Sequence, residues 1–231
     1  MLAVSGRSKV VSYGTDQLRP TNCNIALTEL DYTSHMLLFK SVPNRGSRPR
    51  YSDSDIFWTM YMMSGAERVG RKILCDELDM GEGSARNLLS LLDSCDLINT
   101  FQTGSVLSER GQELFDSIPI HPVFIDIPEG IPGRYHSTVI VRDKGSEITN
   151  GMRERDAGIR SGGLGCTTLV YRDGHLFMPP DWDLDDKSPR YSEYLRSLDV
   201  MGPDDALIIG SADDAYTART SAANAAFTLV G

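Results

Sequence analysis

Three consecutive helical patterns that lead into a strand and a hairpin constrain the fold of this chain more than any other feature. Apolar residues recur at helical spacing over residues 52–65, 70–78 and 83–95. Ile73, Leu74 and Leu78 are expected to face inward from the second helix. Gly81 and Gly83 stand between the second and third helices, where they predict a tight turn. The second and third helices therefore form a helix-turn-helix pair that packs on the first.

A strand pair and a fourth helix complete this pattern. Leu97-Ile98 begins a strand, and Thr103-Gly104-Ser105 predicts the hairpin turn from which the chain returns. Ser108 is placed to cap a helix that ends near Ser117. The resulting order of elements is helix, helix, turn, helix, strand, hairpin, strand and helix, which is typical of a winged helix-turn-helix.

The residues themselves resemble a known family. The stretch GRKILCDELDMGEGSARNLLSLLDSCDLI (Gly70–Ile98) is similar to the helix-turn-helix core of prokaryotic winged-helix transcription regulators. TGSVLSERGQELF (Thr103–Phe115) resembles their wing and the helix start that follows it. The resemblance is strongest to archaeal regulators that carry an uncharacterised C-terminal domain. It implies a transcription regulator that binds double-stranded DNA as a homodimer. Arg7, Lys9, Tyr13 and Asp16 interrupt any apolar stretch of signal-peptide type, so the cytoplasm is the expected location.

The third helix carries the side chains that are expected to read DNA. Five residues project outward from its N-terminal half: Glu82, Ser84, Arg86, Asn87 and Ser90. Residues at this place in a recognition helix reach base edges in the major groove, where Arg and Asn make bidentate contacts with guanine and adenine. Arg71 and Lys72 start the second helix and are expected to contact the DNA backbone. The alternative is that Arg86 and Asn87 form only a solvated helix face.

The charge distribution opposes DNA binding by this domain alone. The net charge of the chain is −9, and residues 51–119 hold five basic and twelve acidic residues. Residues 1–50 hold seven basic and three acidic residues, and Arg45, Arg48 and Arg50 lie in a stretch rich in Pro, Gly and Ser. This basic arm is expected to insert arginines into the minor groove at A·T tracts, the alternative being a solubilising linker. A further alternative is a winged helix that serves as a protein-interaction adaptor.

The remainder of the chain predicts a second domain of another kind. Strand patterns cover residues 123–127, 138–143, 167–172, 175–178 and 206–210, and helical patterns cover 146–161, 189–198 and 213–229. The fold class is therefore α+β, with a winged helix-turn-helix followed by a small α/β sandwich domain. The expected parts are an N-terminal extension and basic arm (1–50), the winged helix-turn-helix (51–119) and an effector-binding or dimerisation domain (120–231).

A glycine-rich loop in this second domain predicts a ligand site. Arg153 and Arg160 are seven residues apart and share one face of a helix that leads into Gly162, Gly163 and Gly165. Glycines let the backbone approach a small molecule, and arginines pair with anions, so a small anionic effector is expected. The alternative is an ordinary helix C-cap and a tight loop.

Other chemistry is weakly indicated. The Asp181–Asp186 segment resembles a calcium loop without its glycine, so a solvated acidic loop and no metal are expected. The four cysteines form no C-x-x-C pair, and no nucleophile, phosphate-loop or zinc-protease motif is present. We therefore expect neither catalysis nor a cofactor, although a small-molecule enzyme with its site in residues 120–231 stays open as an alternative. No apolar run is long enough for a membrane helix, so no membrane partner is expected.

Overall fold

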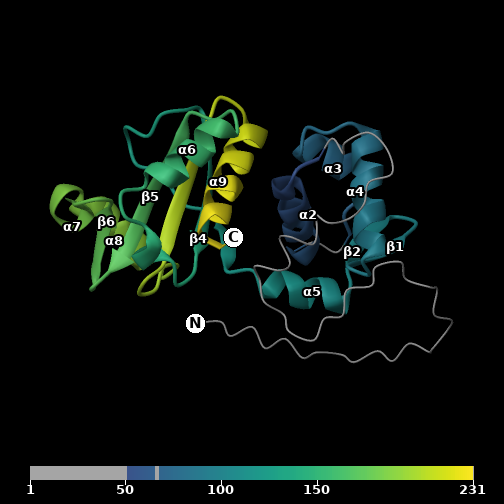
Figure 1. The fold of residues 1–231 in the computed structure, drawn as a ribbon, viewed down its shortest axis with the longest axis horizontal. Coiled ribbons are helices and arrows are strands. Elements are labelled where there is room, and N and C mark those ends of the chain that lie inside the picture. Colours follow the sequence, from purple (N-terminus) through teal and green to yellow (C-terminus); the bar gives the residue numbers. More distant parts are fainter. Residues whose placement is uncertain (1–50, 66–67, 231) are drawn as a thin grey trace.

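The structure, a computed structural model, describes residues 51–65 and 68–230. The predicted arm with Arg45, Arg48 and Arg50 lies outside the described residues. Figure 1 shows two lobes, an N-terminal lobe built from α2 to α5 and a C-terminal lobe built from β3 to α9. Together they form the mixed α+β fold expected from the sequence. Along the described part of the chain, no helix combines the length and the apolar character needed to span a bilayer.

The N-terminal lobe has the winged-helix arrangement. Its elements in chain order are α2 (Asp53–Gly65), α3 (Arg71–Glu77), α4 (Glu82–Ser94), β1 (Ile98–Phe101), β2 (Gly104–Leu107) and α5 (Glu109–Asp116). β1 and β2 form the hairpin, and Val69 pairs with Ser105 of β2 in an isolated antiparallel bridge. Ser108 caps α5 as expected, because its Oγ accepts a hydrogen bond of 2.9 Å from the amide of Gly111.

Two details of the helix-turn-helix pair differ from the expectation. The turn depends on Asp79, which has a φ of 45°, whereas Gly81 is an extended N-cap and Gly83 lies inside α4. Asp tolerates the left-handed conformation, so neither glycine is needed for it. Ile73 does not face inward but is 46% exposed, while Leu74 and Leu78 are buried. The latter two lie four residues apart on one helix face, and Ile73 is rotated away from it.

The C-terminal lobe is a six-stranded sheet covered by helices. Its elements are β3 (Ile120–Val123), β4 (Tyr135–Val141), η1 (Gly145–Glu147), α6 (Met152–Arg160), β5 (Gly165–Arg172), β6 (His175–Met178), β7 (Trp182–Asp183), α7 (Leu184–Lys187), α8 (Pro189–Ser197), β8 (Ala206–Ala212) and α9 (Ala215–Val230). The strand order is β3-β4-β8-β5-β6-β7, and every neighbouring pair is antiparallel. β3 and β7 are therefore the edge strands.

The two faces of this sheet pack against different helices. α6 and α9 cover one face, as Figure 1 shows, and Val139, Val141 and Ile208 contribute to the core there. Ile140, Leu207 and Ile209 alternate with them and belong to a second core on the opposite face, together with Leu184 of α7 and Leu195 of α8. This alternation is what a sheet buried on both sides requires.

Three predictions for this lobe need correction. The strand predicted over 123–127 lies earlier in the chain, because β3 covers Ile120–Val123 and ends where the predicted strand begins. The helix expected over 146–161 is divided into η1 and α6, because Gly151 adopts a left-handed φ of 69° immediately before α6. The acidic segment is not an open loop, since Asp183 ends β7 and caps α7 by accepting the amides of Asp185 and Asp186.

The lobes contact each other through α2, α3 and α9. The indole nitrogen of Trp58 donates to the carbonyl of Arg219 at 3.1 Å. The Arg219 guanidinium donates to the carbonyl of Glu77 at 2.6 Å and to its carboxylate at 2.7 Å. Phe57 packs edge-on against Phe227 with ring centroids 5.9 Å apart. One apolar core therefore continues from the N-terminal lobe to the α9 side of the sheet, and the domain boundary at residues 119–120 stays a prediction.

Candidate nucleic-acid interface

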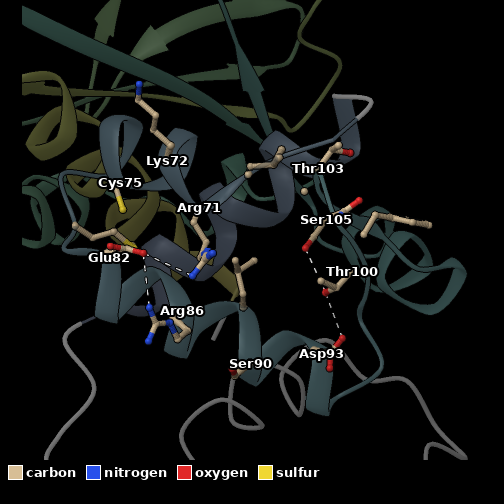
Figure 2. Close-up of a pocket in the computed structure, with 17 residues that line it drawn as sticks. Arg71, Lys72, Cys75, Glu82, Arg86, Ser90, Asp93, Thr100, Thr103 and Ser105 are labelled. Atoms are coloured by element: carbon tan, nitrogen blue, oxygen red, sulfur yellow. Dashed lines mark hydrogen bonds and ion pairs between the residues drawn. The ribbon is translucent and has the colours of Figure 1, made fainter.

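α3, α4 and the β1–β2 hairpin enclose an open groove of about 900 Å³ (Figure 2). Four of the residues that the sequence predicted for DNA binding line it: Arg71, Lys72, Arg86 and Ser90. All four are exposed, because Leu74 takes the buried face of α3 and Ala85, Leu88 and Leu92 take that of α4. Asn87 is exposed and Ser84 half-buried on α4, but neither lines this groove. The helix-turn-helix pair thus brings polar side chains from two helices beside the hairpin.

Glu82 holds two arginines at the centre of this face. Its Oε1 lies 3.6 Å from Nη1 of Arg71 and 3.6 Å from Nη2 of Arg86, as Figure 2 shows. Arg71 starts α3, whereas Glu82 and Arg86 lie one turn apart on α4, so two helices supply the cations that surround one oxygen. The three side chains are between 52% and 69% exposed. Ion pairs this exposed contribute at most about 1 kcal/mol, so a stronger anion can displace the carboxylate.

The hairpin is fastened to the rest of the lobe in part by Arg68 and Phe101, which the sequence analysis did not select. The Arg68 guanidinium stacks over the ring of Phe101, 4.4 Å from its centroid, and donates to Thr103 Oγ1 at 2.5 Å. Gly104 lies so close to Val69 that a Cβ would be 2.9 Å from its carbonyl group. An aromatic residue beside a hairpin turn, with an arginine before the second helix, was the available signal. These contacts fix the hairpin relative to α3.

The groove is only weakly positive. Among the described residues that line it, the cations Arg71, Lys72 and Arg86 stand against the carboxylates Glu82 and Asp93, which leaves one net positive charge. Arg68, which precedes α3, adds a further cation beside the hairpin. The acidic balance of residues 51–119 is therefore not concentrated in the groove.

The residues predicted for an anionic effector do not form a common cavity. Arg153 and Arg160 are exposed on α6, and neither they nor Gly162 and Gly163 line the cavity of about 280 Å³ that Gly165 borders. Gly163 instead permits close packing, because a Cβ there would lie 2.2 Å from Ser221 Oγ of α9. The C-cap alternative accounts for this loop, and the effector site at these arginines stays a prediction.

Two further groups of reactive side chains are satisfied by their neighbours. His175, Asp183 and Asp185 lie close enough to share a metal ion, with His175 Nδ1 at 3.1 Å from Asp185 Oδ2. Asp185, however, already accepts hydrogen bonds from Ser192 and Arg196. Burial acts to raise the pKa of Asp185, but these hydrogen bonds lower it overall.

Cys166 is held as a thiol by its surroundings. Burial, with the nearby charge of Glu154, raises its pKa to about 12. Its Sγ lies 3.4 Å from the carbonyl of Ser221, to which it donates. The thiolate that a nucleophilic cysteine requires is therefore strongly disfavoured.

Two known domain families match parts of this chain. Residues 54–113 match the PH0730-like N-terminal domain. PH0730-like proteins are winged-helix-like, in agreement with the arrangement of α2 to α5. Residues 131–229 match a domain of unknown function, DUF4443.

A solved structure is similar over most of the chain. It is the hypothetical protein PH0730 from Pyrococcus horikoshii OT3, with a sequence identity of 25% and a TM-score of 0.64. The match covers 78% of this chain and 93% of that one. No curated protein matches this sequence. An archaeal relative and a C-terminal domain without assigned function both agree with the resemblance seen in the sequence.

Proposed function

We propose that this protein is a winged-helix transcription regulator that binds double-stranded DNA through α4, the start of α3 and the β1–β2 hairpin. The observation that carries the proposal is the convergence of Arg71 and Arg86 on one oxygen of Glu82. That oxygen occupies the position that a phosphate oxygen of DNA takes in the complex. Arg71 then holds that phosphate, which fixes the register of α4 on the duplex, and Arg86 is released from Glu82 toward the base edges.

Sequence reading is assigned to α4. Arg86 and Asn87 are exposed near its N-terminal end, and Ser84 and Ser90 lie on either side of them. In winged helices this part of the recognition helix enters the major groove, where Arg and Asn discriminate bases. A single recognition helix contacts few base pairs, so homodimerisation would extend the site. We assign either this dimerisation or the sensing of an effector to the C-terminal lobe. The basic arm with Arg45, Arg48 and Arg50 supplies additional phosphate or minor-groove contacts.

The test starts from selection of a preferred duplex from a random pool with the full chain. Arg86→Ala is expected to lose about 1–3 kcal/mol of binding to the selected duplex and to relax the preference at one position. Arg153→Ala removes another exposed arginine, on α6, and serves as the control. Affinities are measured by fluorescence anisotropy at several salt concentrations, because phosphate contacts appear in the salt dependence.

Two results would contradict the proposal. Selection that enriches no sequence, with weak binding to all duplexes, favours the protein-interaction adaptor instead. Equal affinities of the wild type and Arg86→Ala for an enriched duplex remove α4 from the interface.

A further inference from the structure

A second cavity, of about 640 Å³, lies between the two lobes. Its walls come from α2, from α3 and the residues beside it, from the end of β3 and the chain beyond, and from β4 and α9. Its apolar side chains come from α2 (Trp58, Tyr61 and Met62) and from α3 and the residue after it (Ile73 and Leu78). Others come from the end of β3 and the chain beyond (Val123, Phe124, Ile125 and Ile127). This volume is typical of sites for small organic ligands, which are found preferentially between domains.

The apolar rim of this cavity is unusually open to solvent. Phe124 is 89% exposed, more than any other large hydrophobic side chain among the described residues, and Ile73 on the opposite lobe is 46% exposed. Trp58 is almost completely buried at the base. Apolar side chains on both lobes therefore face a space that a ligand would fill and shield from water.

The charges around the cavity favour an anion of single charge. Arg68 and Arg219 are its cations, and Glu77 is its carboxylate among the described lining residues, which leaves one net positive charge. Arg219 already donates to Glu77, so one further negative charge would neutralise the lining of the cavity. His136 and Ser137 add polar groups on the side of β4.

The adjacent sheet edge is unsuited to pairing with another protein strand. β3 is an edge strand, but its third residue, Pro122, has no amide hydrogen to donate. A second copy or an extended peptide cannot continue the ladder there with full hydrogen bonding. The concave shape and this interrupted edge both favour a small molecule over a macromolecule.

We propose that this cavity binds a small amphipathic monoanion, with an alkyl or aryl body between Ile73 and Phe124 and a carboxylate or equivalent group near Arg68 and Arg219. The ligand lies against the hydrogen bonds that join the lobes, from Trp58 to Arg219 and from Arg219 to Glu77. Binding therefore changes the contact between α9 and α3. Control of DNA binding by this ligand rests on the proposed function, whereas binding itself does not.

Tryptophan fluorescence tests the proposal without DNA. The chain has two tryptophans, and Trp182 is exposed on β7 and does not line the cavity. Full-length Trp182→Phe therefore leaves Trp58 as the only tryptophan. The probe is 11-bromoundecanoate below its micelle concentration, since bromine quenches indole fluorescence on contact. We expect saturable quenching that unbrominated undecanoate reverses by competition.

Three further variants in this background locate the ligand. Phe124→Ser is expected to weaken binding about tenfold because the ligand then buries less apolar surface, and folding is preserved because the side chain is exposed. Arg68→Gln is expected to weaken binding of the carboxylate several-fold but to leave binding of the uncharged 11-bromoundecanol unchanged. Ile159→Ser removes an exposed apolar side chain from α6 and should change neither affinity.

Other outcomes would overturn the proposal. Quenching that does not saturate, or that is the same in Phe124→Ser and Arg68→Gln, removes the ligand from this cavity. Sedimentation equilibrium tests whether a second copy of the chain covers the cavity instead. If the wild type is a dimer that does not bind the probe and Phe124→Ser is a monomer, this face is an interface between two copies. Because none of these measurements uses DNA, failure of the proposed DNA binding leaves them unaffected.

Discussion

Replacing Glu82 by Gln should strengthen binding of this protein to DNA. Glu82 is the carboxylate shared by Arg71 and Arg86, and its side chain is 69% exposed at the start of α4. Gln keeps nearly the same volume but removes the negative charge. Both guanidinium groups then lose their shared partner, and the net charge of the groove rises by one.

Two contributions set the size of this effect. A carboxylate about 5 Å from a phosphate repels it by about 0.8 kcal/mol in water-like surroundings. In the wild type, DNA must also displace the carboxylate from two exposed ion pairs, each of which contributes at most about 1 kcal/mol. The expected gain in binding free energy is therefore about 1–2 kcal/mol, or roughly five- to thirtyfold in affinity. The stability of the fold should fall slightly, since an acidic residue in the first helical turn contributes about 0.3–1 kcal/mol.

Fluorescence anisotropy with the selected duplex at several salt concentrations measures this gain. Glu109→Gln is the matched control, because Glu109 is also an exposed acid in the first turn of a helix but does not line the groove. It should change affinity by far less than Glu82→Gln. The reasoning is refuted if Glu82→Gln binds no more tightly than Glu109→Gln, since Arg71 and Arg86 would then not engage DNA.

Two other predictions concern the N-terminal half of the chain. Gly111→Ala should lower the free energy of unfolding by about 1–3 kcal/mol, because its Cβ would lie 2.0 Å from the carbonyl oxygen of Leu97. Gly83→Ala, where nothing lies within 4 Å, should instead raise it by up to about 1 kcal/mol, and denaturant titration compares the two. Deleting residues 1–50 should reduce the slope of log affinity against log salt by about one for each phosphate that the basic arm neutralises. An unchanged slope would identify this segment as a linker.

The winged helix was predictable because its signals are local. Helical periodicity gave the extents of α2, α3 and α4 to within about two residues, and Ser108 was correctly assigned as the cap of α5. The residue three positions after that cap is a glycine, Gly111, because the start of the helix passes directly over the carbonyl of Leu97. The prediction that Ile73 faces inward was wrong, because its helix is short and buries a single row of side chains. Periodicity alone does not show which row that is.

The C-terminal lobe was harder to predict because its details depend on distant partners. The apolar residues after Val123 have the composition of a strand, but they border the cavity between the lobes and do not extend β3. The glycines after α6 looked like a ligand cradle, yet Gly163 is required by the close approach of α9. In both cases the deciding contact comes from an element remote in sequence.

The candidate sites follow the same rule. Glu82 and Arg86 form an i,i+4 pair that the sequence makes visible, whereas the addition of Arg71 requires the turn between α3 and α4. The cavity joins Trp58, Phe124 and Arg219, which no motif connects. Local patterns therefore located the proposed DNA-binding face, and only the folded chain brought the cavity residues together.

The short helix α3 connects the two proposed sites physically. Arg71 at its first residue lies in the groove, and Glu77 at its last residue accepts hydrogen bonds from Arg219 beside the cavity. Seven helical residues span only about 10 Å, and a helix of this length moves as a rigid unit. A ligand that shifts Arg219 therefore also shifts the cation that binds phosphate. Such coupling is reciprocal, so the factor by which the ligand changes affinity for DNA must equal the factor by which the selected duplex changes affinity for the ligand, measured by titrating the quenching of Trp58.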